Sequence, residues 1–110
     1  MEAPQTAFSQ WDLRVGRVLR AEPNERARKP AYKLWIDFGP LGTLQSSAQL
    51  CDRYAPEDLV GRLIVAVTNF PPKNIAGFES QVLVLGVPDA DARVVLLGVD
   101  AEVPLGGKVY

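Results

Sequence analysis

Few side chains in this sequence could take part in bond-making chemistry. The chain of 110 residues has no histidine, the residue that most often acts as a general base or binds a metal ion. Its one cysteine, Cys51, therefore has no imidazole to activate it as a nucleophile, and we expect it to be a packed small hydrophobic residue. These features argue against an enzyme.

Two close pairs of carboxylates remain as candidates for acid–base or metal chemistry. Glu57 and Asp58 follow a proline, a pattern typical of the first turn of a helix, where carboxylates stabilise the N-terminus. Asp89 and Asp91 fit a β-turn, and two carboxylates without further oxygen ligands make a poor calcium site. We therefore expect no catalytic residue, no metal site and no cofactor.

Charge along the chain is uneven, although the net charge is only −1. Residues 1–38 hold seven of the twelve basic side chains and five of the thirteen acidic ones. The small net charge argues against a protein that binds nucleic acid through bulk electrostatics, but the distribution allows a local basic patch. Ordinary solvated surface charge explains the same distribution.

One predicted strand carries an outward-facing aromatic side chain. Residues 32–38 alternate between apolar and other side chains, which is typical of a half-buried strand and places Lys33 and Trp35 on the outer face. The next strand adds two glutamines and a serine to this face: Gln45, Gln49 and Ser47. Trp35 could stack on a nucleobase, hold a peptide side chain or contact a second subunit, or the N-terminal segment could simply cover it.

Short strand-like segments separated by turns must position these side chains. We expect strands over residues 13–22, 32–38, 43–49, 63–68, 82–87 and 94–99. Gly16 indicates a bulge or bend in the first strand, and residues 69–80 read as a polar loop. A helix is expected near residues 54–61, and it should be short because Ala55 is a poor cap. One or two helical turns are also expected near residues 7–12.

This order of elements predicts an all-β fold. Three strands, a short helix and further strands suit the five-stranded OB barrel, in which a helix lies between the third and fourth strands. The length suits a single domain over residues 1–110. We see no membrane-spanning or signal segment, which together with the single cysteine makes the cytoplasm the expected location.

Four segments in order carry a resemblance to a known family: residues 12–18 (DLRVGRV), 29–34 (KPAYKL), 45–49 (QSSAQ) and 69–73 (NFPPK). They resemble the tRNA-binding-domain family, which includes free-standing proteins and the C-terminal appendage of methionyl-tRNA synthetases. The similarity covers nearly the whole chain. It implies the OB fold, a dimer, and a ligand surface near the third strand and the loop at residues 69–80.

Departures from the tRNA-binding members favour one branch of this family. Their loop after the fourth strand is more basic, whereas here it keeps one lysine, Lys73, beside Pro71 and Pro72. Trp35 also stands where close relatives tend to have a polar residue, so that any role for Trp35 would be particular to this protein. The resemblance is therefore strongest to small homodimeric proteins described as export-related chaperones, which implies that unfolded or precursor polypeptides and the export machinery are partners.

Three sets of candidate residues follow. The expected polypeptide-binding set is Ser46, Ser47, Gln49, Asn69, Phe70, Pro71, Pro72, Phe78 and Ser80. The alternative function, a tRNA-binding protein acting in trans on tRNA or a synthetase, would use Arg26, Arg28, Lys29, Lys33, Trp35 and Lys73. The expected dimer interface is apolar and comprises Phe8, Trp11, Val103, Leu105, Val109 and Tyr110.

Overall fold

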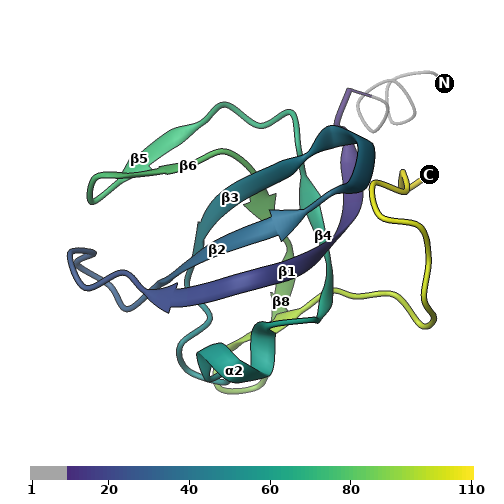
Figure 1. The fold of residues 1–110 in the computed structure, drawn as a ribbon. Helices are drawn as coiled ribbons and strands as arrows, with labels where there is room; N and C mark the ends of the chain where they lie inside the picture. The colour runs from purple at the N-terminus through teal and green to yellow at the C-terminus, as the bar shows by residue number, and fades with distance from the viewer. Residues whose placement is uncertain (1–9) are drawn as a thin grey trace, which may run out of the picture.

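A five-stranded antiparallel sheet forms the body of the protein in this computed structural model, which describes residues 10–110 (Figure 1). The strands, in spatial order, are β3 (Thr43–Ala48), β2 (Tyr32–Asp37), β1 (Leu13–Pro23), β4 (Leu63–Val67) and β7 (Leu83–Val84). The backbone N–H groups of Gln81 and Val82 donate to the Gln45 carbonyl of β3 at 2.8 and 3.4 Å. This contact brings the two ends of the sheet together, so that it nearly closes into a barrel. The architecture is mostly β, as predicted, and is consistent with an OB fold.

The core lies inside the curved sheet. Strand β2 alternates strictly, with Tyr32, Leu34 and Ile36 buried and the residues between them half-buried. This pattern confirms the two-residue period predicted from the sequence. Further fully buried side chains come from the neighbouring elements: Val18, Phe38, Leu59 and Ile64.

The irregularity of β1 lies three residues from where it was predicted. The pairing with β2 shifts between Val18 and Arg20, so that Leu19 is the extra residue and is 48% exposed. Gly16 instead pairs regularly with Ile64 of β4. A Cβ atom at Gly16 would lie only 2.6 to 2.8 Å from side-chain atoms of Ile36 and Phe38. Glycine is therefore needed for close packing at this position, and a bulge at Gly16 is wrong, because the bulge lies at Leu19.

A short helix, α2 (Pro56–Leu59), lies between β3 and β4. Ala55 has no side-chain acceptor to cap it, and instead the Asp58 carboxylate accepts the Ala55 backbone N–H at 3.0 Å. A 3₁₀ turn, η1 (Gly39–Leu41), joins β2 to β3. Residues 10 and 11 form a turn and a bend and residue 12 is irregular, and the rest of the helical turns expected over residues 7–12 lies outside the described residues.

The predicted loop at residues 69–80 is wrong, because it contains a two-stranded hairpin. Strands β5 (Lys73–Ile75) and β6 (Phe78–Ser80) pair antiparallel through a two-residue turn. Both turn residues have positive φ, 53° at Ala76 and 85° at Gly77, as this kind of tight hairpin turn requires. The hairpin stands outside the five-stranded sheet (Figure 1).

The predicted strand over residues 82–87 is also divided. After β7, the chain leaves the main sheet and β8 (Gly86–Pro88) pairs with β9 (Val94–Leu96). Asp89 closes this hairpin by accepting the backbone N–H groups of Asp91 and Arg93, each at 2.9 Å, and the Arg53 guanidinium at 3.0 Å. The hydrogen bond from the Arg93 backbone is the main cause that lowers the pKa of Asp89 to about 2. Asp89 thus acts as a turn residue.

The region from residue 10 onward contains no helix with the length and hydrophobicity needed to cross a bilayer.

Substitution Gly16→Ala is expected to destabilise the protein. The added methyl group would overpack the core against Ile36 and Phe38, which typically costs about 1–3 kcal/mol of unfolding free energy. A urea denaturation midpoint measures the effect. The control is Gly98→Ala, where the nearest atom lies at 3.5 Å and the change should stay within about 0.5 kcal/mol. Equal stability of Gly16→Ala and the wild type would refute the packing role.

Candidate binding groove

Two adjoining hollows lie between the end of β3 and the β5–β6 hairpin. The first, called here the apolar hollow, has a volume of about 420 Å³ and is walled by Phe70, Pro71 and several aliphatic side chains. The second, called here the basic hollow, has a volume of about 620 Å³. Both are lined by Ser47, Gln49 and Ile75, so that they adjoin, and the two hollows together are called here the groove.

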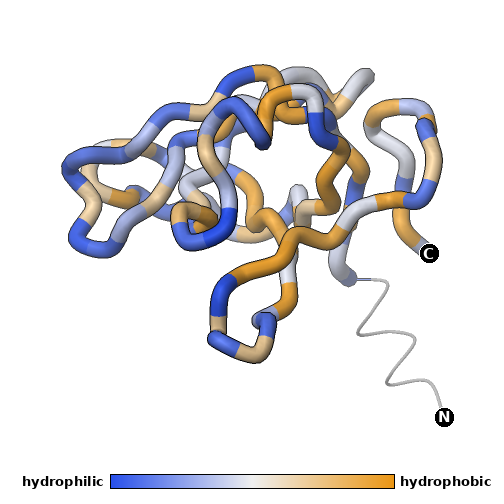
Figure 2. The backbone as a smooth tube through the Cα atoms, turned by 90° about the horizontal axis from the view of Figure 1, so that it is seen from below, coloured by the Kyte–Doolittle hydropathy of each residue, from blue (hydrophilic) through white to orange (hydrophobic). Residues whose placement is uncertain are grey.

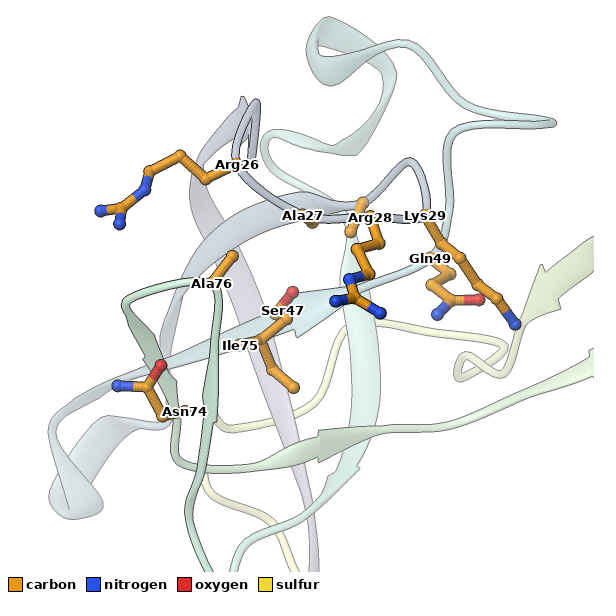
Figure 3. Close-up of a pocket in the computed structure, with 10 residues that line it drawn as sticks. Arg26, Ala27, Arg28, Lys29, Ser47, Gln49, Asn74, Ile75 and Ala76 are labelled. Atoms are coloured by element: carbon orange, nitrogen blue, oxygen red, sulfur yellow. The ribbon is translucent and has the colours of Figure 1, made fainter.

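The basic hollow lies between the β1–β2 loop and the tip of the β5–β6 hairpin. Arg26, Arg28 and Lys29 line it from the loop, opposite Asn74 and Ala76 of the hairpin. Figure 3 shows that the Arg28 and Lys29 side chains extend toward Gln49, whereas that of Arg26 points away from them. Residues at this end of the molecule are mostly hydrophilic (Figure 2). This end of the groove therefore carries positive charge with no carboxylate in its lining.

Side-chain hydrogen bonds hold the hairpin beside β3. The Gln45 side-chain amide donates to the Glu79 carbonyl at 2.8 Å, and the Ser47 backbone N–H donates to the Ser80 hydroxyl at 3.0 Å. From the other side, the buried Asn24 of the β1–β2 loop donates its amide to the Ile75 carbonyl at 3.2 Å. The two walls of the basic hollow are thus linked directly.

Trp35 is half-buried, and residues of two neighbouring strands cover it. The Phe78 ring of β6 meets it edge-on, with ring centroids 5.5 Å apart at 79°. The Arg20 guanidinium of β1 lies 4.5 Å from the centre of the Trp35 ring. Trp35 therefore does face outward from β2, but its ring is already occupied by protein contacts.

The structure brings together only part of the predicted polypeptide-binding set. Five members line the apolar hollow: Ser47, Gln49, Phe70, Pro71 and Ser80. Ser46 of β3 instead points into the core and is buried, and Pro72 is exposed and lines neither hollow. Phe78 faces Trp35. Asn69 accepts the Asp12 backbone N–H at 2.8 Å and donates to the Gln10 carbonyl at 2.7 Å, so that it anchors the segment before β1.

The predicted basic set is distributed over three places. Arg26, Arg28 and Lys29 line the basic hollow, and Lys73 lines the apolar one. Lys33 lies farther along the surface, 3.9 Å from the Glu22 carboxylate and 5.8 Å from the Phe78 ring centre. Lys33 and Lys73 therefore lie outside the lining of the basic hollow.

The predicted dimer residues gather around the start of β1. The C-terminal segment pairs there, because the Val109 backbone N–H donates to the Leu13 carbonyl at 2.9 Å (Figure 1). Trp11 is 44% exposed and stacks on Phe70, and Tyr110 is fully exposed. Val103 is exposed, Leu105 is half-buried, and Phe8 lies outside the described residues.

Cys51 lies half-buried against the hydrophobic core. Burial raises the pKa of its thiol, which keeps the thiol protonated and unreactive near neutral pH. Across residues 10–110, histidine, cysteine and carboxylate side chains form no group of three or more that could hold a metal ion.

Sequence reasoning missed several residues of the groove and its surroundings. Val82, Leu83, Val84 and Val94 line the apolar hollow from strands that are distant in sequence. Their runs were read as core strands, although Leu83 is 43% exposed. Arg20 was also missed, because only the one-residue bulge at Leu19 brings it into register with Trp35.

A family profile and two solved structures match nearly the whole chain. The sequence profile of the putative tRNA binding domain matches residues 13–108. Among solved structures, the chaperone CsaA from Bacillus anthracis is 56% identical with a TM-score of 0.89, covering 96% of both chains. The CsaA chaperone from Picrophilus torridus is 45% identical with a TM-score of 0.90, covering 96% of this chain and 97% of that one.

Curated relatives are longer proteins. Methionine–tRNA ligase from Thermotoga maritima is 42% identical over 102 residues, which is 93% of this chain but only 16% of the ligase. The chain thus spans about a sixth of the length of this enzyme.

Proposed function

Because the chain belongs to the tRNA-binding-domain family, we propose that it is a non-catalytic binding protein on an OB-type barrel. It holds non-native or export-destined polypeptides in the cytoplasm and acts as a homodimer. Likeness to two CsaA chaperones over nearly the whole chain supports this function. The observation that carries it is the groove, in which an apolar hollow and a basic hollow adjoin.

The walls of the apolar hollow suit an extended polypeptide. Phe70, Pro71 and Ile75 line the hollow together with aliphatic side chains of β7 and β9. Proline at position 71 limits the backbone freedom of one wall, so that less ordering is needed when a ligand binds. Shallow apolar pockets of this kind accept many side chains, which favours low sequence selectivity.

Substitution Leu83→Asp is expected to impair this binding. Leu83 lines the apolar hollow and is 43% exposed, so that the barrel should tolerate the change. Losing the burial of one leucine against a ligand would weaken binding by about tenfold or more. The measurement is suppression of light scattering from an aggregating denatured protein at stoichiometric ratio.

Leu41→Asp is the matched control, since Leu41 is 44% exposed in η1 and lines neither hollow. Equal aggregation with and without the wild-type protein would contradict the proposal. So would an equal loss of activity in the two variants.

Binding of tRNA is the second candidate, and the family match together with the basic hollow favours it. The double variant Arg28→Gln/Lys29→Gln should then weaken tRNA binding and reduce the slope of log affinity against log salt by about two. Gel shifts over a range of salt concentrations measure this slope. Lys108→Gln, an exposed basic residue that lines neither hollow, is the control. Undetectable binding of tRNA at low salt would rule out this function.

The homodimer is supported by apolar side chains that one barrel leaves exposed around the start of β1. Trp11 and Tyr110 are exposed there, Val103 is exposed in the segment that leads to it, and a second copy of the chain would remove these side chains from water. Light scattering at micromolar concentration should give twice the chain mass of 12.0 kDa. A monomeric mass under these conditions would refute the dimer.

A further inference from the structure

The β5–β6 hairpin forms a wall of the groove but is not part of the main sheet. Its two strands pair only with each other, and no backbone–backbone hydrogen bond within residues 10–110 joins them to the five-stranded sheet. Ile75 at the end of β5 lines both hollows, and Asn74 and Ala76 beside it line the basic one. The position of the hairpin tip therefore determines the width of the groove.

Side chains hold the base and the tip of this hairpin separately. The hydrogen bonds of Gln45 and Ser47 secure the base, at Glu79 and Ser80. Nearer the tip, the Asn24 amide donates to the Ile75 carbonyl, the Arg26 guanidinium lies beside Gly77, and the Trp35 ring meets Phe78. Of these contacts, the aromatic one joins the hairpin to β2 of the five-stranded sheet.

Charged neighbours fix the orientation of the aromatic pair. Arg20 lies 4.5 Å from the centre of the Trp35 ring, and Lys33 lies 5.8 Å from the centre of the Phe78 ring. The Glu22 carboxylate accepts the Arg20 Nε–H at 2.6 Å and lies 3.9 Å from Lys33 Nζ. One carboxylate thus holds both cations over the two rings, and the five side chains restrain one another.

We propose that Trp35 is a positioning residue that holds the tip of the β5–β6 hairpin against β2 and so sets the width of the groove. Trp35 does not contact the ligand itself, because Arg20 and Phe78 occupy its ring. A groove held at its working width loses less conformational freedom when a polypeptide binds, and its affinity rises accordingly. The effect on affinity depends on the proposed polypeptide-binding function, but the effect on the hairpin does not.

Amide hydrogen exchange of the free protein tests the effect on the hairpin without any ligand. In Trp35→Leu, the amides that pair β5 with β6 should exchange about tenfold faster, because the substitution removes the aromatic contact that opposes local opening of the hairpin. The amides of β4 should keep their wild-type rates, since β4 lies in the main sheet. Trp35→Phe keeps a ring against Phe78 and should restore most of the protection.

A double-mutant cycle tests whether the hairpin position sets affinity. Trp35→Leu and Phe78→Leu should each weaken binding of a fluorescent unfolded polypeptide several-fold, and the double variant should bind no worse than Phe78→Leu alone. Leu83→Asp combined with Trp35→Leu is the control pair. Its effects should multiply, because Leu83 lines the apolar hollow and has no direct contact with the aromatic pair.

Unchanged exchange of the hairpin in folded Trp35→Leu would overturn the proposal. Faster exchange with unchanged affinity would overturn the claim that hairpin position sets the working width. If the wild type binds no polypeptide at all, the proposed function fails, and the exchange rates still decide the role of Trp35. If Trp35→Leu does not fold, Phe78→Leu, which removes the same aromatic contact, replaces it in the exchange experiment and in the pair with Leu83→Asp.

Discussion

Close packing beneath β1 is the constraint on which the rest of this structure depends. Strand β1 pairs with β4 through its first half and with β2 through its second half, and Arg17 takes part in both pairings. Gly16 lets Ile36 and Phe38 pack directly against the strand, and Leu19 adds one residue within the pairing with β2, a bulge of the kind that bends a strand. The resulting curvature brings the β1–β2 loop to the same end of the barrel as the β5–β6 hairpin.

The groove between the β1–β2 loop and the β5–β6 hairpin offers a surface for binding a ligand. The bends and turns leave carboxylates in structural positions, as with Asp89, whose hydrogen bonds are taken by its own hairpin and by Arg53. The one thiol, Cys51, is packed against the core. What remains accessible in the groove is apolar surface at one end and the cations Arg28 and Lys29 at the other. Such a surface offers a ligand apolar contact area and positive charge.

Much of the fold could be predicted because its signals are local. The alternation of β2 required only a period of two residues, and the short helix α2 followed from its proline and acidic first turn. The hairpin at residues 73–80 was missed because its turn, Ala76-Gly77, lacks the usual asparagine or aspartate before glycine. The bulge was misplaced because a glycine needed for packing and a glycine in a bulge look alike in a sequence.

The sequence by itself determined the class of fold, the family, and the shortage of residues able to do chemistry, since each of these is read from composition, period or motif. Only the tertiary structure decided which residues form the groove. Leu83 and Val94 line it from strands that are distant in the chain. Ser46 is buried instead, and Asn69 holds the segment before β1 by a hydrogen bond to Asp12. Trp35 was outward-facing by its position in β2, but Phe78 and Arg20 cover it because the hairpin and the bulge bring them there. Proximity of this kind depends on how strands cross in space, which local sequence does not encode.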